Sequence, residues 1–401
     1  MDRKDVAVYE RVIGVDVAKS AHHHCTVDPS GDVVSRGEMR SDERSVAEAL
    51  ASAASGLRAL VVVDQHRTFG APLVRCAQAC GMDVACVSPR DFARASELWG
   101  EDKTDALDAA VLARIPLAVP GIAHLLPLPD EALEALREVS SVREGCVCER
   151  TRAYNRLHDL VCRMCPAWEQ VLARNRLHTR QALTILSRYG CPSALRRSGE
   201  RARAWVARQP GCGAGASELA GRLLRAAREQ EAPVAAEDVL GRRASSLARR
   251  LLELEAECSL LEEEIEAVGQ GVRDYAILRS VPGFGVAASA AAAGAIGDIS
   301  RFGSPAKLAT YSGLSARNHE SGTSVRGTRG RKGGNRVLKA AFFRSAAMAA
   351  MTHAPSAAYY GKKRAEGKSH VQAVRALARR RVDVVFALLS KGEMFDQARH
   401  A

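Results

Sequence analysis

The sequence predicts an α/β sheet domain over residues 1–125, followed by two regions that are mainly helical. Three strands are expected within residues 11–39, and apolar runs at 57–64 and 82–89 are typical of buried strands. Helical segments lie between these runs and after them. A strand meander followed by alternating helices and strands favours a sheet with helices packed against it.

The connections that follow the three meander strands carry helical signals. A helix is expected over 41–55, where Ser41 is a suitable cap, and another over 72–80. The stretch EDKTDALDAAVLARIP (101–116) also predicts a helix. Asp105 and Asp108 then share one face, because helical residues three apart lie side by side.

Residues 126–272 are expected to form a helical region built on a coiled coil. Apolar residues recur there at alternating steps of four and three, the heptad pattern of a coiled-coil seam: Leu247, Leu251, Leu254, Cys258, Leu261, Ile265 and Val268. The run 131–161 is a candidate antiparallel partner. Pro, Gly and Arg in irregular order predict an inserted subdomain or loop at about 170–235.

Residues 273–401 form the predicted C-terminal domain, which contains a helix-hairpin-helix-like motif. In SVPGFGVAASAAAAG (280–294), Gly283 and Gly285 permit a tight turn, and the amides of the next helix are suited to a phosphate. An ordinary helical turn packed on alanine, with Phe284 in the core, is an equally good interpretation.

The composition favours a polyanionic partner. The 401 residues carry a formal net charge of +12, and 47% are hydrophobic, which is ample for buried cores. Without an apolar run that spans a bilayer or a signal-peptide core at the start, we expect a cytoplasmic, nucleoid-associated protein with no membrane partner.

The eleven cysteines lack the spacing of a disulfide framework, so free thiols are expected. A zinc site formed by Cys146, Cys148, Cys162 and Cys165 is the less favoured alternative. The consecutive histidines 22–24 resemble a metal tag, but alternation along a strand predicts that the middle one points away from its neighbours.

Four aspartates are candidates for one acidic site. Asp16 ends the first expected strand, Asp64 ends the fourth, and Asp105 and Asp108 share a helix face. Four adjacent carboxylates repel one another unless cations compensate, and Mg²⁺ (or Mn²⁺) prefers such oxygen ligands and supports phosphodiester chemistry. A ribonuclease-H-like fold needs acids in this order. Isolated turn or cap residues are the alternative interpretation.

The glycine-rich strip HESGTSVRGTRGRKGGNR (319–336) is a candidate phosphate-binding loop. Its Ser321 is a turn or donor residue unless a base, a metal or local positive charge activates the hydroxyl as a nucleophile. The side chains expected to hold phosphates are those of Arg326, Arg329, Arg331, Lys332 and Arg336. In the helical region, Arg152 and Arg156 form either a solvated face or a further nucleic-acid contact.

Several stretches together resemble the transposases of the insertion-sequence 110 family. They are IGVDVAKS, VVVDQHRTFGAPLV, VACVSPRDFARASELWGEDKTDALDAAVLA, LRSVPGFG and YSGLSARNHESGTSVRGTRGRKGGNRVL. The blocks KTDxxDA and ESGxSxRG are specific in combination, and the similar stretches cover both ends of the chain.

The resemblance implies a RuvC-like domain with an Asp-Glu-Asp-Asp quartet, a coiled coil and a C-terminal transposase domain. The quartet matches Asp16, Asp64, Asp105 and Asp108, so Asp64 replaces the usual Glu with a side chain one methylene shorter. The resemblance also implies that Ser321, ahead of Ser324 and Thr323, attacks DNA and forms a covalent phosphoserine link.

The same resemblance implies the partners. They are donor and target DNA, a structured bridge RNA that guides the enzyme by base pairing, and further copies of the chain in a homodimer or homotetramer. The serine is then expected to meet the quartet of another protomer. We therefore expect a site-specific DNA recombinase of a mobile element; a junction-resolving nuclease using water and a non-enzymatic nucleic-acid-binding protein are the rivals.

Overall fold

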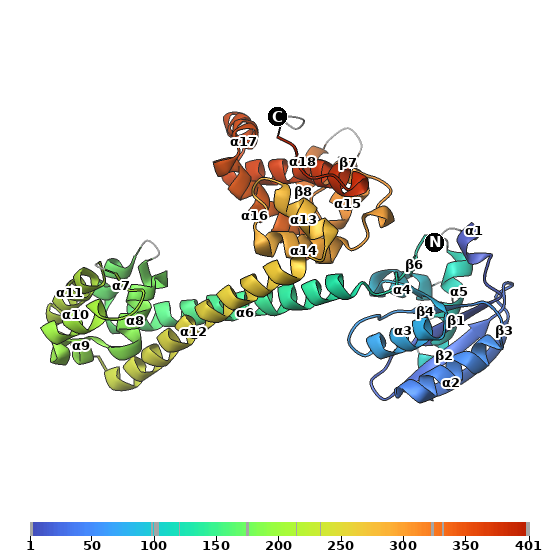
Figure 1. Cartoon of the computed structure of the whole chain (residues 1–401), viewed down its shortest axis with the longest axis horizontal. Coiled ribbons are helices and arrows are strands. Elements are labelled where there is room, and N and C mark those ends of the chain that lie inside the picture. The colour runs from blue at the N-terminus through green and yellow to red at the C-terminus, as the bar shows by residue number, and fades with distance from the viewer. Residues whose placement is uncertain are drawn as a thin grey trace. The chain divides into compact units, whose positions relative to one another are not determined.

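The computed structural model describes residues 3–97, 99, 104–119, 121–173, 176–213, 215–232, 234–321, 325–330 and 333–397. They belong to two compact units, Met1–Pro129 and Asp130–Ala401 (Figure 1). The first boundary thus lies at 129, where 125 was expected. The boundary expected at 272 falls inside the second unit.

The first unit is built on a six-stranded sheet with the order β3-β2-β1-β4-β5-β6. Its strands are β1 (Arg11–Asp16), β2 (Ala21–Val27), β3 (Val33–Arg40), β4 (Ala59–Val63), β5 (Asp83–Cys86) and β6 (His124–Leu125). β1, β2 and β3 form an antiparallel meander, β1, β4 and β5 are parallel, and β6 is antiparallel to β5. The α/β class predicted for this part is confirmed.

Helices cover both faces of this sheet. They are α1 (Arg3–Val6), α2 (Glu43–Ala54), α3 (Gly70–Ala79), α4 (Pro89–Ser96) and α5 (Asp105–Ala118). Val12 and Leu60 share a core with α5, whereas Ile13 and Val61 on the opposite face share one with α2 and α3. The cap of α2 is Asp42 rather than the expected Ser41, because the Asp42 carboxylate accepts the Ser45 backbone N–H at 3.0 Å.

The approach of α5 to β1 depends on Gly14. A Cβ atom at this position would overlap the backbone of Ala109 and Ala113, and would lie 2.9 Å from the Ala113 Cα atom. Glycine therefore lets the helix backbone rest directly on the strand. Asp16, two residues further along β1, faces the same side as Gly14 and thus the beginning of α5.

The second unit contains an antiparallel pair of long helices, α6 (Glu131–Met164) and α12 (Glu237–Gly269), which run alongside each other in Figure 1. Ion pairs from Arg143 to Glu262 and from Arg250 to Glu149 fix the antiparallel direction. In the predicted seam, the side chains of Leu251, Leu254, Cys258 and Ile265 are buried, and those of Leu247, Leu261 and Val268 are half-buried. The apolar heptad positions thus lie on the less exposed side of α12.

The cysteines are free thiols, as expected. Cys146 and Cys258 are both buried in the α6–α12 seam, with their sulfur atoms 2.9 Å apart. Cys148, two residues along the helix, is exposed. Cys146 thus belongs to a pair within the seam rather than to a cluster with Cys148.

The region expected as an insertion at 170–235 is a small helical subdomain on α6 and α12. Its helices are α7 (Pro166–Leu172), η1 (Arg176–His178), α8 (Arg180–Arg188), α9 (Pro192–Ser198), α10 (Glu200–Ala207) and α11 (Gly215–Arg228). Trp168 is fully buried in its core, and its indole N–H donates to the Leu223 carbonyl at 2.9 Å. Pro192, one of the prolines that made the segment look irregular, begins α9, where the missing N–H has no cost, and Pro166 begins α7 in the same way.

The C-terminal part is mainly helical and carries one β-hairpin. Its elements are α13 (Arg273–Ser280), α14 (Val286–Ile296), η2 (Ile299–Arg301), α15 (Pro305–Tyr311), β7 (Ala316–Ser321), β8 (Val325–Gly330), α16 (Arg336–Thr352), α17 (Ala354–Ala365) and α18 (His370–Lys391). Its core continues into the start of α6 through Leu136 and into the end of α12 through Ile265. Across the described segments, no helix combines the length and the apolar character that crossing a membrane requires.

Replacing Gly14 with Ala is expected to destabilise the first unit by about 1–3 kcal/mol, because backbone atoms of α5 cannot move aside as a flexible side chain would. The calorimetric unfolding transition of the purified chain measures this change. Gly145→Ala is the matched control, since its Cβ would meet open space on α6 and alanine favours a helix. Equal stability of the Gly14→Ala variant and the wild-type protein would contradict the close approach.

Candidate active site

Two aspartates lie next to each other at the carboxyl ends of two neighbouring strands of the sheet. Asp16 is the last residue of β1, and Asp64 directly follows β4. The two strands are parallel neighbours, with Val15 opposite Val63 in the register. The carboxyl ends of neighbouring parallel strands are a common position for functional groups in α/β sheets.

The first turn of α5 adds Asp105 and Asp108 to this end of the sheet. Thr104 is the N-cap of the helix, because its hydroxyl accepts the Leu107 backbone N–H at 3.3 Å. Asp105 is therefore not the helix cap that the alternative interpretation allowed it to be. Both carboxylates lie at the positive end of the helix dipole, which favours negative charge there.

The four carboxylates interact electrostatically. The pKa of Asp16 is raised to about 6, chiefly by burial and further by repulsion from Asp64, Asp105 and Asp108. Burial also raises the pKa of Asp64, and Asp108 adds to that increase, while backbone amides, including that of Val17, oppose it. Acids from two strands and one helix are thus close enough to raise the pKa of Asp16.

The donor chemistry of this acidic cluster suits a hard cation. All four side chains offer carboxylate oxygens, and the buried Oδ1 atom of Asp64 has no hydrogen-bond partner among the described residues. Within those same segments, no three acidic, histidine or cysteine side chains are already arranged around one point as metal ligands. The side chains would therefore have to rotate to surround an ion.

His23 faces the acidic cluster. It lies opposite Asp16 in the β1–β2 register, and its Nδ1 atom is 3.8 Å from Oδ2 of Asp105. His22 instead accepts the Ala18 backbone N–H at 3.1 Å, and His24 packs where a Cβ atom at Gly37 would lie 2.6 Å from its ring. Alternation of the three histidines is confirmed. Alternation alone does not show that His23, the middle histidine, points toward the acidic cluster.

The serine strip is only partly described. Ser321 ends β7 and pairs with Val325 at the start of β8, so it lies next to the tip of the hairpin. Arg326 and Arg329 belong to β8, and Arg336 is the first residue of α16. The other expected residues of the strip, Thr323, Ser324, Arg331 and Lys332, lie outside the described residues.

The helix-hairpin-helix-like motif forms a tight turn between α13 and α14. Gly283 has a φ of 84°, and a Cβ atom there would lie 2.8 Å from the Ala349 amide nitrogen, so the turn rests on the backbone of α16. Gly285 is the N-cap of α14 and leaves the first amides of that helix without a side-chain cap. Phe284 is nevertheless a core residue, packed edge-on against Phe342.

A buried arginine supports this turn. Arg381 of α18 is only 6% exposed, and it donates to the Pro282 carbonyl and to the Ser345 hydroxyl, the latter at 2.9 and 3.1 Å. Burial lowers its pKa to about 10. Sequence reasoning missed this residue, although it occupies a position in the apolar stripe of α18 between Leu377 and Val385, where a charged side chain is unusual.

The two arginines predicted on the helical arm lie on the surface of α6. Arg152 and Arg156 are both exposed and one helical turn apart, and each directly precedes a buried position, Ala153 and Leu157 respectively. They are therefore on the solvent side of the coiled coil, which is compatible with either role considered for them.

Comparison with known proteins decides the family. Residues 13–166 match the IS110 DEDD family described as transposase, and residues 275–361 match the family described as Transposase IS116/IS110/IS902. A 43.6 kDa protein of insertion element IS110 from Streptomyces coelicolor is 35% identical over 400 residues, covering 98% of this chain and 97% of the relative. The chain belongs to the IS110 family of transposases.

Proteins of two other insertion elements also match over almost the full length. A 44.8 kDa protein of insertion element IS116 from Streptomyces clavuligerus is 31% identical over 388 residues, covering 96% of both chains. A 42 kDa protein of insertion element IS900 from Mycobacterium paratuberculosis is 31% identical over 394 residues, covering 96% of this chain and 97% of the relative. The resemblance inferred from the sequence motifs is confirmed at the level of the family.

The raised pKa of Asp16 predicts the pH dependence of the metal-free protein. Because the folded state binds this proton more tightly than the unfolded chain, the free energy of unfolding should fall as pH rises from about 4 to about 6. The expected change is on the order of 1–2 kcal/mol, allowing for solvent screening. Denaturant titrations with chelator at several pH values measure it.

Asp16→Asn should remove most of this pH dependence and raise the stability above pH 6. Asp32→Asn, at an exposed turn, is the matched control and should keep it. The same pH dependence in the wild-type protein and in Asp16→Asn between pH 4 and 6 would contradict the raised pKa of Asp16.

Arg381→Leu is expected to destabilise the protein by about 1–3 kcal/mol, because the Pro282 carbonyl and the Ser345 hydroxyl lose their donor in a buried place. Denaturant unfolding measures the loss. The exposed neighbour Arg380 provides the control, and Arg380→Leu should change stability by no more than about 0.5 kcal/mol. Equal effects of the two substitutions would argue against a structural role for the buried guanidinium.

Proposed function

We propose that this transposase cuts and rejoins DNA strands with its acidic cluster and Ser321, passing through a covalent serine–DNA link. The observation that carries the proposal is the electrostatic coupling of Asp16 to Asp64, Asp105 and Asp108, three acids from distant parts of the chain. Carboxylates that repel one another are stabilised when a cation binds between them, and such a cation can also hold a phosphate.

The proposed catalytic domain has a ribonuclease-H-like, RuvC-type fold. Support comes from the strand order, with an antiparallel meander on one side of β1 and the parallel strands β4 and β5 on the other. Support also comes from the positions of the acids on β1, after β4 and on α5, the order that such a fold requires.

The four aspartates are proposed to hold Mg²⁺, with Mn²⁺ as a substitute. A bound divalent ion supplies Lewis-acid stabilisation of the charge that builds up on the phosphate oxygens. Asp16 and Asp64 would hold it from the sheet, and Asp105 and Asp108 from the helix. Because the side chain of Asp64 is one methylene shorter than that of Glu, it reaches less far toward the ion. The other three aspartates would then contribute more to positioning the ion.

Ser321 is proposed as the nucleophile. Its Oγ atom forms a bond to the scissile phosphorus while one P–O ester bond breaks; the hydroxyl proton leaves, and the departing sugar oxygen gains a proton. One phosphoester bond replaces another, so strands can be rejoined without ATP. A nucleophile beside the tip of a hairpin is suited to reach a phosphate outside its own domain.

The surrounding cations are proposed to hold the DNA backbone. Arg326, Arg329, Arg331, Lys332 and Arg336 would contact phosphates near the serine, and the amides after Gly283 and Gly285 would bind backbone without reading sequence. Two or four copies of the chain are proposed to assemble so that Ser321 of one meets the acidic cluster of another.

A structured guide RNA is proposed as a further partner. Base pairing would then select the donor and target sites, while the protein holds shape and backbone. The net charge of +12 and the exposed Arg152 and Arg156 on α6 support a second polyanion. Sequencing the nucleic acid that copurifies with the protein tests this, and one defined RNA from the flank of the element is the expected result.

Trapping of a protein–DNA adduct tests the nucleophile. Denaturing gels of the protein incubated with labelled DNA and Mg²⁺ should show a covalent band that Ser321→Ala abolishes and Ser324→Ala retains. If cleavage persists in Ser321→Ala without any adduct, water is the nucleophile and the chain acts as a junction-resolving nuclease.

Removal of single carboxylates tests the acidic cluster. Asp105→Asn and Asp108→Asn should each lower strand cleavage by at least about 100-fold, because each removes a charge needed to hold the cation at the phosphate. Asp32→Asn, in the same unit, should leave cleavage unchanged. Full cleavage by both cluster variants would favour a nucleic-acid-binding protein whose acids are surface residues.

A further inference from the structure

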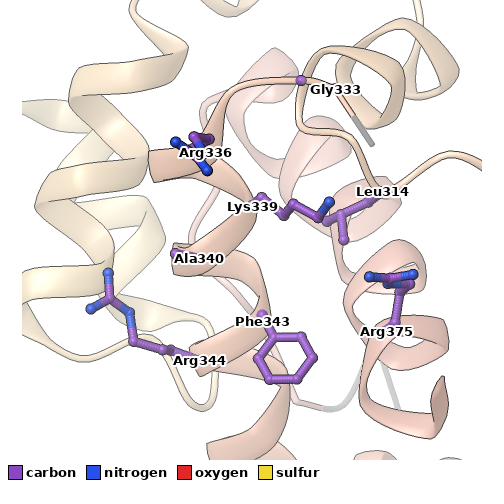
Figure 2. A pocket seen from close by; sticks show the side chains of 9 residues that line it. Leu314, Gly333, Arg336, Lys339, Ala340, Phe343, Arg344 and Arg375 are labelled. Carbon is purple, nitrogen blue, oxygen red and sulfur yellow. The ribbon is translucent and has the colours of Figure 1, made fainter. Parts of the chain in front are cut away.

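A pocket of about 440 Å³ lies between α16 and α18, in the C-terminal part of the chain (Figure 2). It is lined by Leu314, Gly333, Gly334, Arg336, Lys339, Ala340, Phe343, Arg344 and Arg375. Its volume is within the range of sites that hold small organic groups. The acidic cluster belongs to the first unit, so this pocket is a separate feature.

The pocket is strongly cationic. Four of its lining residues are Arg or Lys, and none of the lining residues is acidic. Arg344 is paired with Glu144 of α6 at 3.7 Å, so its charge is partly compensated. Arg336 and Arg375 make no ion pair or hydrogen bond with any other described residue. The pocket therefore favours an anionic occupant.

An apolar wall accompanies these charges. Figure 2 shows Lys339 and Phe343 on the side of α16 that faces Arg375 of α18, with Leu314 nearby. The Phe343 ring is half-buried, whereas its neighbour Phe342 is fully buried in the core. A half-exposed aromatic face beside cations suits an occupant that has both a flat ring and a phosphate.

The rim of the pocket is held in place at the base of the β7–β8 hairpin, where residues 311–315 meet residues 333–335. The Asn335 backbone N–H donates to the Tyr311 carbonyl at 2.7 Å, and the Asn335 side-chain amide donates to the Tyr311 hydroxyl at 3.1 Å. Gly313 and Gly334 both have positive φ, and a Cβ atom at Gly334 would lie 2.6 Å from the Gly313 Cα atom. The segments before β7 and after β8 are thus tied together at the pocket.

We propose that this pocket binds one unstacked nucleotide of a single DNA strand, with the base against Phe343 and the phosphate between Arg336, Lys339 and Arg375. The inference rests on the proposed function, because the strand meant is the one that Ser321 attacks. Ser321 is five residues along β7 from Ala316, which begins the strand at the base of the hairpin, or about 17 Å along the strand. The bound nucleotide would therefore lie a few positions away from the scissile phosphate and fix the strand there.

A single strand fits these features better than a duplex does. In a duplex the base faces are stacked and cannot reach a recessed phenyl ring, whereas an unpaired base can stack on it. Stacking on an aromatic ring tolerates any base, so the pocket would position a strand without selecting its sequence.

The test compares a short fluorescein-labelled single-stranded DNA with a strand of equal length whose sugars are abasic, using the full-length protein and fluorescence anisotropy. Both strands carry the same phosphates, so a difference in affinity reports on the bases. The wild-type protein should bind the natural strand at least about fivefold more tightly. Phe343→Leu, which keeps apolar bulk but lacks the ring, should reduce this preference to less than twofold.

The cations are tested by salt dependence. Arg375→Gln should lower the slope of log affinity against log salt by about 0.7 and keep the preference for bases. Arg249→Gln removes the same charge from an exposed position on α12 and should leave both slope and preference unchanged. Unfolding measurements on each variant verify that the fold is intact.

Three outcomes would overturn the proposal: full base preference in Phe343→Leu, tighter binding of a duplex of the same sequence, or a Phe343-dependent preference seen only with the matching RNA. The last outcome would assign the pocket to RNA. The adduct assay with Ser321→Ala is independent of this pocket, so failure of the nucleophile proposal and failure of the pocket proposal give different results.

Discussion

The contact between α5 and β1 at Gly14 is the constraint on which the acidic cluster depends. Asp105 and Asp108 lie in the first turn of α5, and Asp16 lies two residues beyond the glycine on the strand. Any side chain at Gly14 would push the helix away from the sheet and increase the distance between the carboxylates. The absence of a Cβ atom at Gly14 thus allows the carboxylates from β1, from the end of β4 and from α5 to lie close enough to affect one another's pKa.

The acidic cluster and Arg381 both place charge in partly or fully buried surroundings, and the consequences differ. The carboxylates of the acidic cluster repel one another, so this part of the fold is less stable than its packing alone would make it, a usual property of functional sites. Arg381 is also desolvated, but its donors are used by Pro282 and Ser345. The first arrangement leaves binding capacity for an added ion, whereas the second holds a turn in one conformation.

Much of the architecture could be predicted because its signals are local. The strand ending in Asp16, the heptads around Leu254 and the helix carrying Asp105 each follow from periodicity within a short window. The order of the acids along those elements then indicated that they meet. The helical subdomain between α7 and α11 was less clear, because prolines that begin short helices look like loop residues when only the sequence is seen.

Other features depend on contacts between distant residues and carry little local signal. Arg375 and Phe343 come together only because α16 and α18 pack against each other, and neither residue belongs to a recognisable motif. The side to which His23 points follows from its register opposite Asp16, which alternation alone does not determine. Motifs therefore selected the acids and the serine strip as candidates, whereas the pocket required the packed structure.

The antiparallel path of α6 and α12 has a consequence for variation in chain length. Because α12 returns to the point where α6 began, Arg137 near the start of α6 donates to the Gly294 carbonyl of α14 at 2.8 Å. Whole heptads can be added to or removed from both helices together without disturbing that junction. The length of the α6–α12 pair that carries the α7–α11 subdomain can therefore vary in evolution without a change in the part of the chain that carries Ser321.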